Sequence, residues 1–533
     1  IRHAIGLDIP VERVFDTMVC AMAHSLPGGL DKLCDILKVG TDKAKDKAGK
    51  KLIQLFCKPL AKKSVLRRAT RETHPVQWHE FREYGRLDIE AMREIYKKLP
   101  QWNYRGFERE LWHLDQKINE RGAPTDQELA QAAVTASTRA QKDLGEEAFR
   151  LTDGEVSSAN QRNKMLDHIA EHYGIILDDL KGRTLKDLLE NPEIPDVLRE
   201  LLLVRADASQ TSVSKYKRVL SGVSSDGRLR GLLAFCGALR TGRWAGRMVQ
   251  PQNLKRPTMK NHFIEEGIEA LKAGAEDLLC KATTMDICSN AMRGVFIPTR
   301  GKKMVVADLA GIENRVLAWM AGEQWKLQAF REFDTQKGID GNWYKGEQLR
   351  EFALSGIAMA IQTNGKGDAI TLGPDMYKKA YAEAFVVDVD AVDSFMRQIG
   401  KVMELMLGYQ GAVGAFLTGA AAYGIDLEAL AEKAWDTIPA HEREKSSGLR
   451  EWQLNQGRSD YGLSERAYIV CDSLKSLWRG ANSNIAAWWK EVESAAIMAV
   501  ERPGNTFTAR TVKFRKDGAW LRMLLPSGRY LCY

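Results

Sequence analysis

Apolar residues recur at helical spacing along most of the chain, and strand-like alternation is confined to short segments. Recurrence every three or four residues predicts helices, which fall at 84–99, 107–120, 311–321, 373–423 and 475–500. Residues 304–307, Met-Val-Val-Ala, predict a buried strand. Residues 506–533 alternate around Lys516-Asp517-Gly518, a sequence typical of a hairpin turn. The pattern predicts an α+β protein that is mainly helical and has an antiparallel sheet.

Prolines, glycines and polar stretches divide this pattern into regions. Pro100 ends the first of these helices, and residues 125–128, Thr-Asp-Gln-Glu, predict a capping box at the start of a further helical region. Residues 234–257 are rich in Gly, Arg, Gln and Asn and predict an extended loop with a function. Because 533 residues are too many for one hydrophobic core, the length predicts roughly three or four domains.

The composition is that of a folded protein without a membrane partner. Hydrophobic residues make up 44% of the chain and charged residues 28%, which argues against disorder. No apolar run reaches the roughly 20 residues that span a bilayer. Eight Cys without a Cys-x-x-Cys pair form no metal-ligand pattern and suit reduced thiols in a cytosol. The start, Ile-Arg-His, has neither an initiator Met nor a signal peptide, which indicates a cut start and a cytoplasmic location.

Basic residues are concentrated near the start of the chain. The net charge is +8, and residues 38–72 alone hold twelve Lys or Arg against three Asp or Glu. A basic stretch attracts phosphate backbones through counterion release. It equally suits a solvated helical face, so charge alone leaves nucleic-acid binding open.

The first motif with chemical potential is Asp308-Leu-Ala-Gly-Ile-Glu313-Asn-Arg315, directly after the predicted strand. A carboxylate at a strand end can hold Mg²⁺ against a triphosphate, because hard oxygen ligands suit this ion and the ion offsets developing charge. The competing interpretation is that Asp308 caps the following helix, as Asp commonly does. Taken alone, the motif favours the cap.

The second motif lies on one predicted helix, where Arg397, Lys401, Leu405 and Tyr409 are spaced by four. This spacing places them on one face, where two cations could bind a triphosphate and the aromatic ring could lie beside a base. The competing interpretation is an amphipathic helix whose charges face water. The helix also carries a separate apolar set, so its basic face need not be the solvent face; this set is Ile399, Val402, Met403 and Met406.

The order and residue identities of these two motifs closely resemble family-A DNA polymerases, the family of bacterial DNA polymerase I and many phage replicases. The resemblance covers nearly the whole chain. It implies that Asp308 binds a catalytic metal ion and that Glu313 excludes a ribose 2′-hydroxyl. It also implies that Arg397 and Lys401 bind the incoming phosphates, while Tyr409 closes on the nascent base pair.

Two further matches support this resemblance. Thr241-Gly242-Arg243 followed by Gln252-Asn253 is similar to the family's primer-template loop, with Arg243 as its main cation; Arg315 is implied as a further primer-template contact. Tyr84-Gly-Arg-Leu-Asp88 resembles the last motif of the associated 3′→5′ exonuclease, in which Asp88 would bind metal and Tyr84 would orient the attacking water. A Tyr and an Asp four apart on a helix are common, but residues 15–18 and 28–31 also resemble the phage branch.

The resemblance implies a right-hand polymerase with thumb, palm and fingers, mostly helical with an antiparallel palm sheet, preceded by part of an RNase H-like exonuclease domain. Its cofactor would be Mg²⁺, two ions per active site. Its partners would be primer-template DNA and deoxynucleoside triphosphates in a bacterial or phage-infected cell. The implied domains are 1–100, exonuclease; 101–233, thumb and connecting helices; 234–330, palm; 331–504, fingers; and 505–533, the start of a returning palm segment.

The sequence also departs from the family pattern. Leu405 stands where many members carry Phe or Tyr, which bears on discrimination at the sugar's 3′ position, and Gln410 separates Tyr409 from Gly411. The His-Asp-Glu motif that supplies the second metal-binding Asp does not occur in the 533 residues. Asp472 is no substitute, because Ser473 follows it and a helical pattern continues.

The first two exonuclease motifs do not precede residue 15 either. Two-metal chemistry needs carboxylates on both sides of the ions. We therefore expect an interior fragment of a polymerase that is inactive alone in both reactions. One alternative is a single-subunit RNA polymerase, against which Glu313 argues; equal incorporation of ribonucleotides and deoxynucleotides would favour it. The other is a non-catalytic DNA-binding module, which the neighbouring coding sequence would separate from a fragment.

Overall fold

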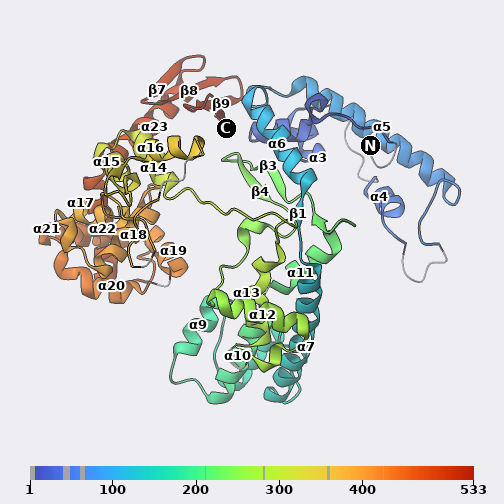
Figure 1. Cartoon of the computed structure of the whole chain (residues 1–533), viewed down its shortest axis with the longest axis horizontal. Coiled ribbons are helices and arrows are strands. Elements are labelled where there is room, and N and C mark those ends of the chain that lie inside the picture. The colour runs from blue at the N-terminus through green and yellow to red at the C-terminus, as the bar shows by residue number, and fades with distance from the viewer. Residues whose placement is uncertain are drawn as a thin grey trace. The chain divides into compact units, whose positions relative to one another are not determined.

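The computed structural model describes residues 6–39, 49–60, 66–210, 212–279, 282–356, 360–365, 367–423 and 425–533. The chain divides into two compact units, Ile1–Val306 and Ala307–Tyr533 (Figure 1). Both units are mainly helical, and all strand pairs are antiparallel. These features confirm the predicted α+β class. Within the described ranges, no helix has the length and apolar character that a membrane span requires.

The first part of the first unit is built around one long helix, α5, over Pro75–Lys98. Buried side chains such as Ala91 and Ile95 pack it against the shorter helices on either side in the sequence. The predicted helix 84–99 is therefore confirmed as the second half of a longer element. The neighbouring helices are α2 (Thr17–Ala23), α3 (Leu30–Ile36), α4 (Gly49–Cys57) and α6 (Phe107–Arg121).

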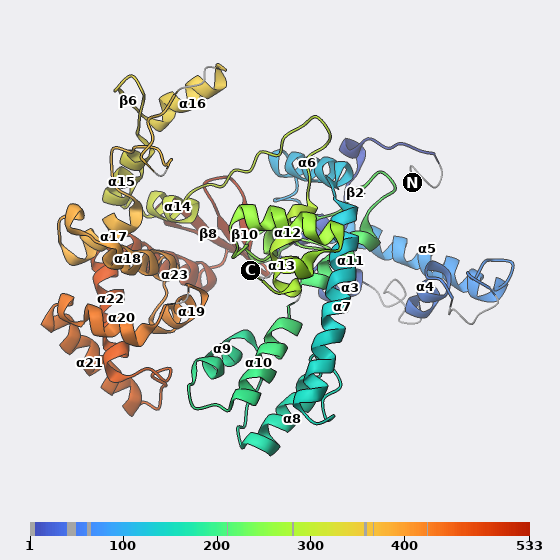
Figure 2. The same cartoon turned by 60° about the horizontal axis from the view of Figure 1, so that its bottom comes forward.

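The second part of this unit is organised by α7, a 25-residue helix over Gln127–Leu151. One end of α7 packs against α11, α12 and α13, and its other end packs against α10. Figure 2 shows α8, α9 and α10 gathered around that second end. The bounds are α8 (Arg162–Tyr173), α9 (Gly182–Glu190), α10 (Asp196–Ala208), α11 (Ser212–Gly222), α12 (Asn261–Ala273) and α13 (Thr284–Ala291).

The start of α7 differs from the predicted capping box. Asp126 is the cap, because its carboxylate accepts a hydrogen bond from the Leu129 backbone N–H at 2.9 Å. Thr125 instead donates its hydroxyl to the Gly227 carbonyl at 3.0 Å. Asp is a strong cap in its own right, so the predicted helix is confirmed and the predicted capping residue is wrong by one position.

The first half of the predicted extended loop, 234–257, forms a hairpin, and residues 247–257 lie outside strands. Strand β3 (Leu233–Ala238) pairs with β4 (Arg243–Gly246), and Ala238 lies opposite Arg243. Gly242, at φ +65°, takes the left-handed conformation that closes the turn. A short 3-10 helix, η3 (Pro251–Asn253), follows; β1 (Ala123–Pro124) pairs with β2 (Arg228–Leu229).

The second unit packs its helices around a core that includes Met403, Phe416 and Trp478. The buried faces of α18 and α22 meet in this core. Its elements are α14 (Ile312–Ala321), α15 (Gln324–Asp334), β5 (Gln336–Lys337), β6 (Trp343–Tyr344), α16 (Gly346–Leu354), α17 (Met376–Phe385), α18 (Ser394–Leu407), α19 (Val413–Tyr423), α20 (Leu427–Ala434), α21 (Ala440–Asn455), α22 (Glu465–Ala481) and α23 (Ser483–Glu501).

A four-stranded meander follows α23, in the order β10-β9-β8-β7. Val512 and Phe514 are buried and join the core to which α23 contributes Ala495 and Ala499. Asp517 lies opposite Trp520, with Gly518 in the turn, so the predicted hairpin is confirmed. The strands are β7 (Thr506–Ala509), β8 (Val512–Asp517), β9 (Trp520–Leu524) and β10 (Tyr530–Cys532).

The strand predicted over 304–307 is wrong for this structure. These residues have no strand pairing, and Val305 and Val306 are 89% and 86% exposed. A strand exists only through hydrogen bonds to a neighbouring strand, and none of the described segments pairs with this one. Residues 304–307 therefore have an apolar sequence but no adjacent strand to pair with.

Candidate active site

The two sequence motifs meet through one side-chain contact. Glu313 lies in the first turn of α14, and the Tyr409 hydroxyl donates a hydrogen bond to its carboxylate. Both residues line a cavity of about 340 Å³. The other lining residues are Asn314, Leu317, Gly408, Gln410 and Trp489.

The backbone after α18 presents Tyr409 to this cavity. The helix begins at the cap Asp393, whose carboxylate accepts from the Met396 N–H, and it ends at Leu407. Gln410 has a φ of +61°, which breaks the helix. The prediction that Tyr409 continues the helical face is wrong, because α18 ends two residues before it. Tyr409 is 66% exposed.

A glycine allows this turn to form. A Cβ at Gly411 would lie 2.1 Å from the Met406 carbonyl oxygen, so any side chain there would displace the backbone. A Cβ at Gly408 would lie 3.4 Å from the Asn314 Oδ1. Gly411 is therefore required by the turn that follows α18, whereas a side chain at Gly408 would make only an ordinary contact with α14.

The predicted phosphate-binding cations lie on α18, and the described geometry is clearest for Arg397. Its Nε donates to the Asp375 carboxylate at 2.8 Å, and its guanidinium lies 5.4 Å from the centroid of the Tyr377 ring. Asp375 also caps α17 by accepting from the backbone N–H groups of Tyr377 and Lys378. Lys401 and Leu405 follow at intervals of four and are half-buried. A carboxylate that holds the Arg397 side chain was not predicted from the sequence.

A buried ion pair lies next to the basic positions of α18, because Glu404 follows Arg397 by seven residues, which is two helical turns. Lys326 donates to both oxygens of Glu404, at 2.8 and 2.9 Å, and Trp478 Nε1 donates to the same carboxylate at 2.8 Å. Lys326 and Glu404 are each 1% exposed. These bonds connect α15, α18 and α22. These bonds were not predicted, although a single acidic residue within the apolar sequence 402–407, Val-Met-Glu-Leu-Met-Leu, is the signal that could have revealed the pair.

Asp308 lies in the exposed segment that leads into α14. It is not among the residues that line the cavity shared by Glu313 and Tyr409. Arg315 restrains this segment, because its Nε donates to the Ala310 carbonyl at 2.9 Å while Asp334 accepts two bonds from its guanidinium, at 2.5 and 2.8 Å. Arg315 thus contacts protein groups here, and its predicted contact with primer-template stays a prediction.

The predicted primer-template residues lie together in the first unit. Arg243 is exposed at the start of β4, and Arg240 and Arg247 are exposed on the same hairpin. The amide of Gln252 packs over Gly246, where a Cβ would lie 2.3 Å from its Nε2. The Asn253 carbonyl accepts from Lys215 at 2.9 Å. The hairpin therefore carries a basic surface next to the predicted Gln and Asn.

Trp244 anchors this hairpin to α6. Its Nε1 donates to the buried Asp115 carboxylate at 2.8 Å. Burial raises the pKa of Asp115, while hydrogen bonds from Trp244, Gln116 and Asn119 oppose the rise. The carboxylate ties β4 to α6 and so holds the strand on which Arg243 lies.

The predicted exonuclease residues are only partly brought together. Asp88 lines a cavity of about 350 Å³ together with Asp16, Thr17 and Gly28, which belong to the two segments that resemble the phage branch. The Asp88 Oδ1 is buried and has no hydrogen-bond partner in the described ranges. Tyr84 is buried one turn earlier on α5, where its ring stacks on Phe81.

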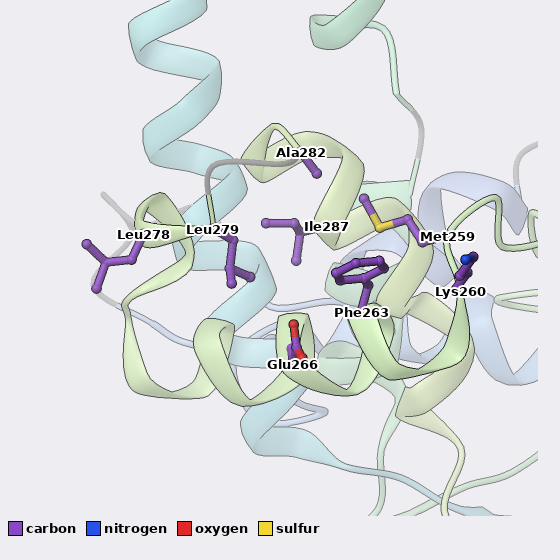
Figure 3. A pocket seen from close by; sticks show the side chains of 8 residues that line it. All are labelled: Met259, Lys260, Phe263, Glu266, Leu278, Leu279, Ala282 and Ile287. Carbon is purple, nitrogen blue, oxygen red and sulfur yellow. The ribbon is translucent and has the colours of Figure 1, made fainter.

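Asp472, which was not predicted to bind metal, makes structural contacts. It is buried within α22 and accepts hydrogen bonds from Ser446 and Lys475. Another cavity, of about 500 Å³, lies beside α12 and α13 and is lined mainly by apolar side chains (Figure 3). Lys260 and Glu266 are the charged members of its lining, so it offers no pair of carboxylates for a metal ion.

Comparisons with known proteins place the chain in a family. No protein-family model matches it. The chain is 32% identical over 526 residues to the DNA polymerase of Bacillus phage SP02, a match that covers 97% of this chain and 67% of the phage protein. Among solved structures, it is similar to the POL domain of Pol1 from M. smegmatis in complex with DNA primer-template and dNTP, with a TM-score of 0.42, 14% identity, and coverage of 91% of this chain and 72% of that one.

The structural similarity is too low to carry weight, so the assignment rests on the sequence relative. A match of this identity over nearly the whole chain defines a DNA-directed DNA polymerase. The chain belongs to the phage branch of the DNA polymerase I-like, family-A DNA polymerases. This confirms the family resemblance that the two motifs indicated, and neither the RNA polymerase nor the non-catalytic module is favoured by any comparison.

Proposed function

We propose that this chain supplies most of a polymerase active site that adds deoxynucleotides to a primer 3′-hydroxyl and releases pyrophosphate. The observation that carries the proposal is the hydrogen bond from Tyr409 to Glu313, because it brings together the two motifs that would face one nucleotide. The exposed carboxylate of Asp308, five residues before Glu313, is a hard oxygen ligand of the kind that Mg²⁺ prefers. Two Mg²⁺ ions, when bound, would activate the attacking oxygen and stabilise the leaving one.

The remaining roles belong to the chain's own side chains. Arg397 and Lys401 bind the triphosphate oxygens, for which charge-assisted hydrogen bonds are suited. Asp375 holds the Arg397 guanidinium in place before the nucleotide arrives. Tyr409 lies beside the nascent base pair, and Glu313 occupies the space that a ribose 2′-hydroxyl would need. Leu405, on the same helix, lies near the sugar.

We further propose a division of the chain into functional domains. The exposed arginines of the β3–β4 hairpin support a role for Arg243, Gln252 and Asn253 in binding primer-template. The orphaned Asp88 oxygen beside a cavity supports a metal ligand in a 3′→5′ exonuclease, with Tyr84 orienting water. The proposed domains are exonuclease over 1–100, thumb over 101–233, palm over 234–330, fingers over 331–504 and a returning palm segment over 505–533.

We also propose that residues 1–533 alone catalyse neither reaction. Asp308 is the one carboxylate that the family motifs assign to the polymerase metals within these residues, and Asp88 is the one that they assign to the exonuclease. Two ions need ligands on both sides. The chain spans 67% of the length of its phage relative, and further carboxylates would come from residues outside 1–533.

The phosphate-binding role can be tested with that natural, full-length polypeptide. Arg397→Ala removes charge-assisted hydrogen bonds that contribute about 1.5–3 kcal/mol, so the KM for a deoxynucleotide should rise roughly 10- to 100-fold. Arg458→Ala is the matched control, because Arg458 is an exposed cation of the same unit that lies over Trp452. An unchanged KM in Arg397→Ala would contradict the role. Primer extension by residues 1–533 alone would contradict the proposed inactivity and leave the family assignment intact.

A further inference from the structure

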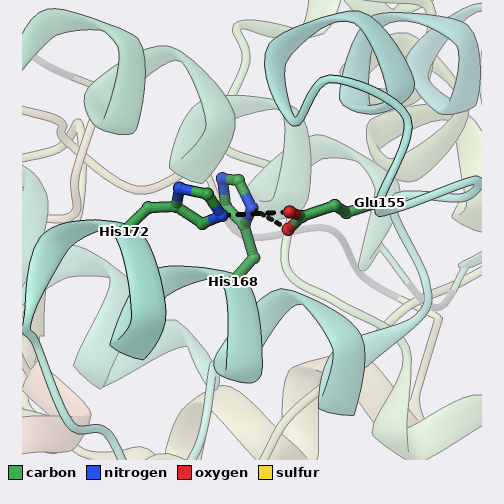
Figure 4. Close-up of side chains that lie close together, drawn as sticks. All are labelled: Glu155, His168 and His172. Atoms are coloured by element: carbon green, nitrogen blue, oxygen red, sulfur yellow. Dashed lines mark hydrogen bonds and ion pairs between the residues drawn. The ribbon is translucent and has the colours of Figure 1, made fainter.

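A cluster of three metal-ligating side chains lies far from the polymerase motifs in the sequence. His168 and His172 are on α8, and Glu155 lies in the connection between α7 and α8 (Figure 4). The His168 Nδ1 is 2.6 Å from one Glu155 carboxylate oxygen, and the His172 Nε2 is 3.0 Å from the other. One ligand atom from each residue lies within 4.8 Å of the others.

The local fold brings these three residues together for identifiable reasons. Two residues four apart lie on one face of a helix, and the buried Met165 and Ile169 orient α8 so that His168 is only 6% exposed. Glu155 is held by its neighbour Val156, which is fully buried and whose N–H donates to the Thr152 hydroxyl at 3.1 Å. The cluster is therefore built on a packed helix and an anchored turn.

The ligand set favours a transition metal. Two imidazole nitrogens and one carboxylate are the protein ligands of open tetrahedral zinc sites, in which water takes the fourth position. Imidazole ligands suit Zn²⁺ and similar ions, whereas Mg²⁺ and Ca²⁺ prefer oxygen. Two His at positions i and i+4 of a helix are a recurring zinc-binding arrangement. This spacing, His-x-x-x-His over residues 168–172, was not among the motifs predicted from the sequence.

The distances fit a site that opens slightly to admit an ion. Bonds of about 2.0–2.2 Å to a tetrahedral ion separate the ligand atoms by about 3.3 Å. This separation is longer than the two hydrogen-bond distances, 2.6 and 3.0 Å, and shorter than the 4.8 Å within which all three ligand atoms lie. The side chains of Glu155 and His172 are 46% and 50% exposed, so they can move by this amount without disturbing the core.

We propose that Glu155, His168 and His172 bind one transition-metal ion, Zn²⁺ in preference to Mg²⁺, with solvent completing the coordination. The ion fastens the connection after α7 to α8. The proposal does not depend on the proposed polymerase mechanism, because it uses none of the residues assigned to that site.

The test is Zn²⁺ binding by the complete chain after removal of metals with a chelator. Zn²⁺ is titrated against a competing chromogenic chelator in excess Mg²⁺, which occupies oxygen-rich sites. The wild type should bind one Zn²⁺ per chain through this site, and its Tm should rise with Zn²⁺. Loss of a residue that only hydrogen-bonds a metal ligand weakens metal binding roughly 10- to 100-fold. His172→Ala and Glu155→Gln each remove a ligand itself, so each should weaken Zn²⁺ binding by more than this. Both substitutions are at partly exposed side chains, so the fold should be retained.

Matched controls separate this site from adventitious binding. Glu171→Gln removes an exposed acid from the same helix, and His79→Ala removes an exposed His from α5. Both variants should bind Zn²⁺ as the wild type does. Co²⁺ bound to the wild type should show a visible tetrahedral absorption that His172→Ala lacks. Equal Zn²⁺ affinity and equal Tm increase in wild type, His172→Ala and Glu155→Gln would overturn the proposal and leave the cluster as an ion pair.

Discussion

The Tyr409 hydroxyl donates a hydrogen bond to the Glu313 carboxylate, across 96 residues of sequence. The bond joins the first turn of α14 to the turn that follows α18. The side chain proposed to exclude the 2′-hydroxyl and the one proposed to lie beside the base pair are thereby held together. We therefore expect this pair of residues to take part in selecting deoxynucleotides over ribonucleotides.

Replacing Glu313 should admit ribonucleotides. Glu313→Ala removes the bulk that would clash with a 2′-hydroxyl, and discrimination of this kind is worth about 100-fold in a pocket that rejects an added hydroxyl. The ratio of kcat/KM for a deoxynucleotide over its ribonucleotide should fall at least about tenfold in the full-length polypeptide. Tyr409→Phe is the control, because it breaks the hydrogen bond and keeps the carboxylate in place. An unchanged ratio in Glu313→Ala would reject the gate.

Breaking the buried pair of Lys326 and Glu404 should destabilise the second unit. Lys326→Met leaves the Glu404 charge buried without its partner, which costs about 3–5 kcal/mol in the free energy of unfolding. Adding Glu404→Gln should recover part of this loss, because the double variant has no buried charge and keeps an acceptor for Trp478. Denaturant unfolding followed by tryptophan fluorescence measures both.

The exposed Lys490 on α23 provides the control for this pair. Lys490→Met should change the free energy of unfolding by no more than about 0.5 kcal/mol, as surface substitutions usually do. A Lys326→Met variant as stable as Lys490→Met would show that the pair contributes nothing to the packing of α15 against α18.

Asp115 should add a defined pH dependence to stability. Burial raises its pKa above the ordinary value of 3.8, so the folded chain holds this proton more tightly than the unfolded chain. The folded state is therefore favoured by this group below pH 3.8, and the contribution is lost as pH rises through the raised pKa. Asp115→Asn cannot titrate. The difference in Tm, wild type minus Asp115→Asn, should fall as pH rises through this interval, and a constant difference would contradict the raised pKa.

The helices of the site could be predicted from the sequence because their periodicity is local. The predicted helix 311–321 corresponds to α14, and the pattern over 475–500 corresponds to parts of α22 and α23, which break at Asn482. The short strand 304–307 could not be judged in this way. Its structure depends on a neighbouring strand rather than on its own residues, and its exposed valines show that apolar sequence alone does not make a strand.

The side-chain partners within the site were beyond prediction for a similar reason. Asp375 meets Arg397 across 22 residues, and Lys326 meets Glu404 across 78. Such pairs depend on how helices pack, which spacing within one helix does not reveal. The end of α18 before Tyr409 was also missed, because Gly408 is compatible with helix and the break lies in the backbone of Gln410.

The central claim is that Asp308 and the cations of α18 act on the same incoming nucleotide. Single-nucleotide extension by the full-length polypeptide tests it most directly, with DNA binding measured in parallel and Asp340→Ala, at an exposed Asp of the same unit, as the control. Asp308→Ala should slow extension at least about a thousandfold, equivalent to about 4 kcal/mol in the barrier, and leave primer-template affinity unchanged. Extension by Asp308→Ala at the rate of the Asp340→Ala control would contradict the account.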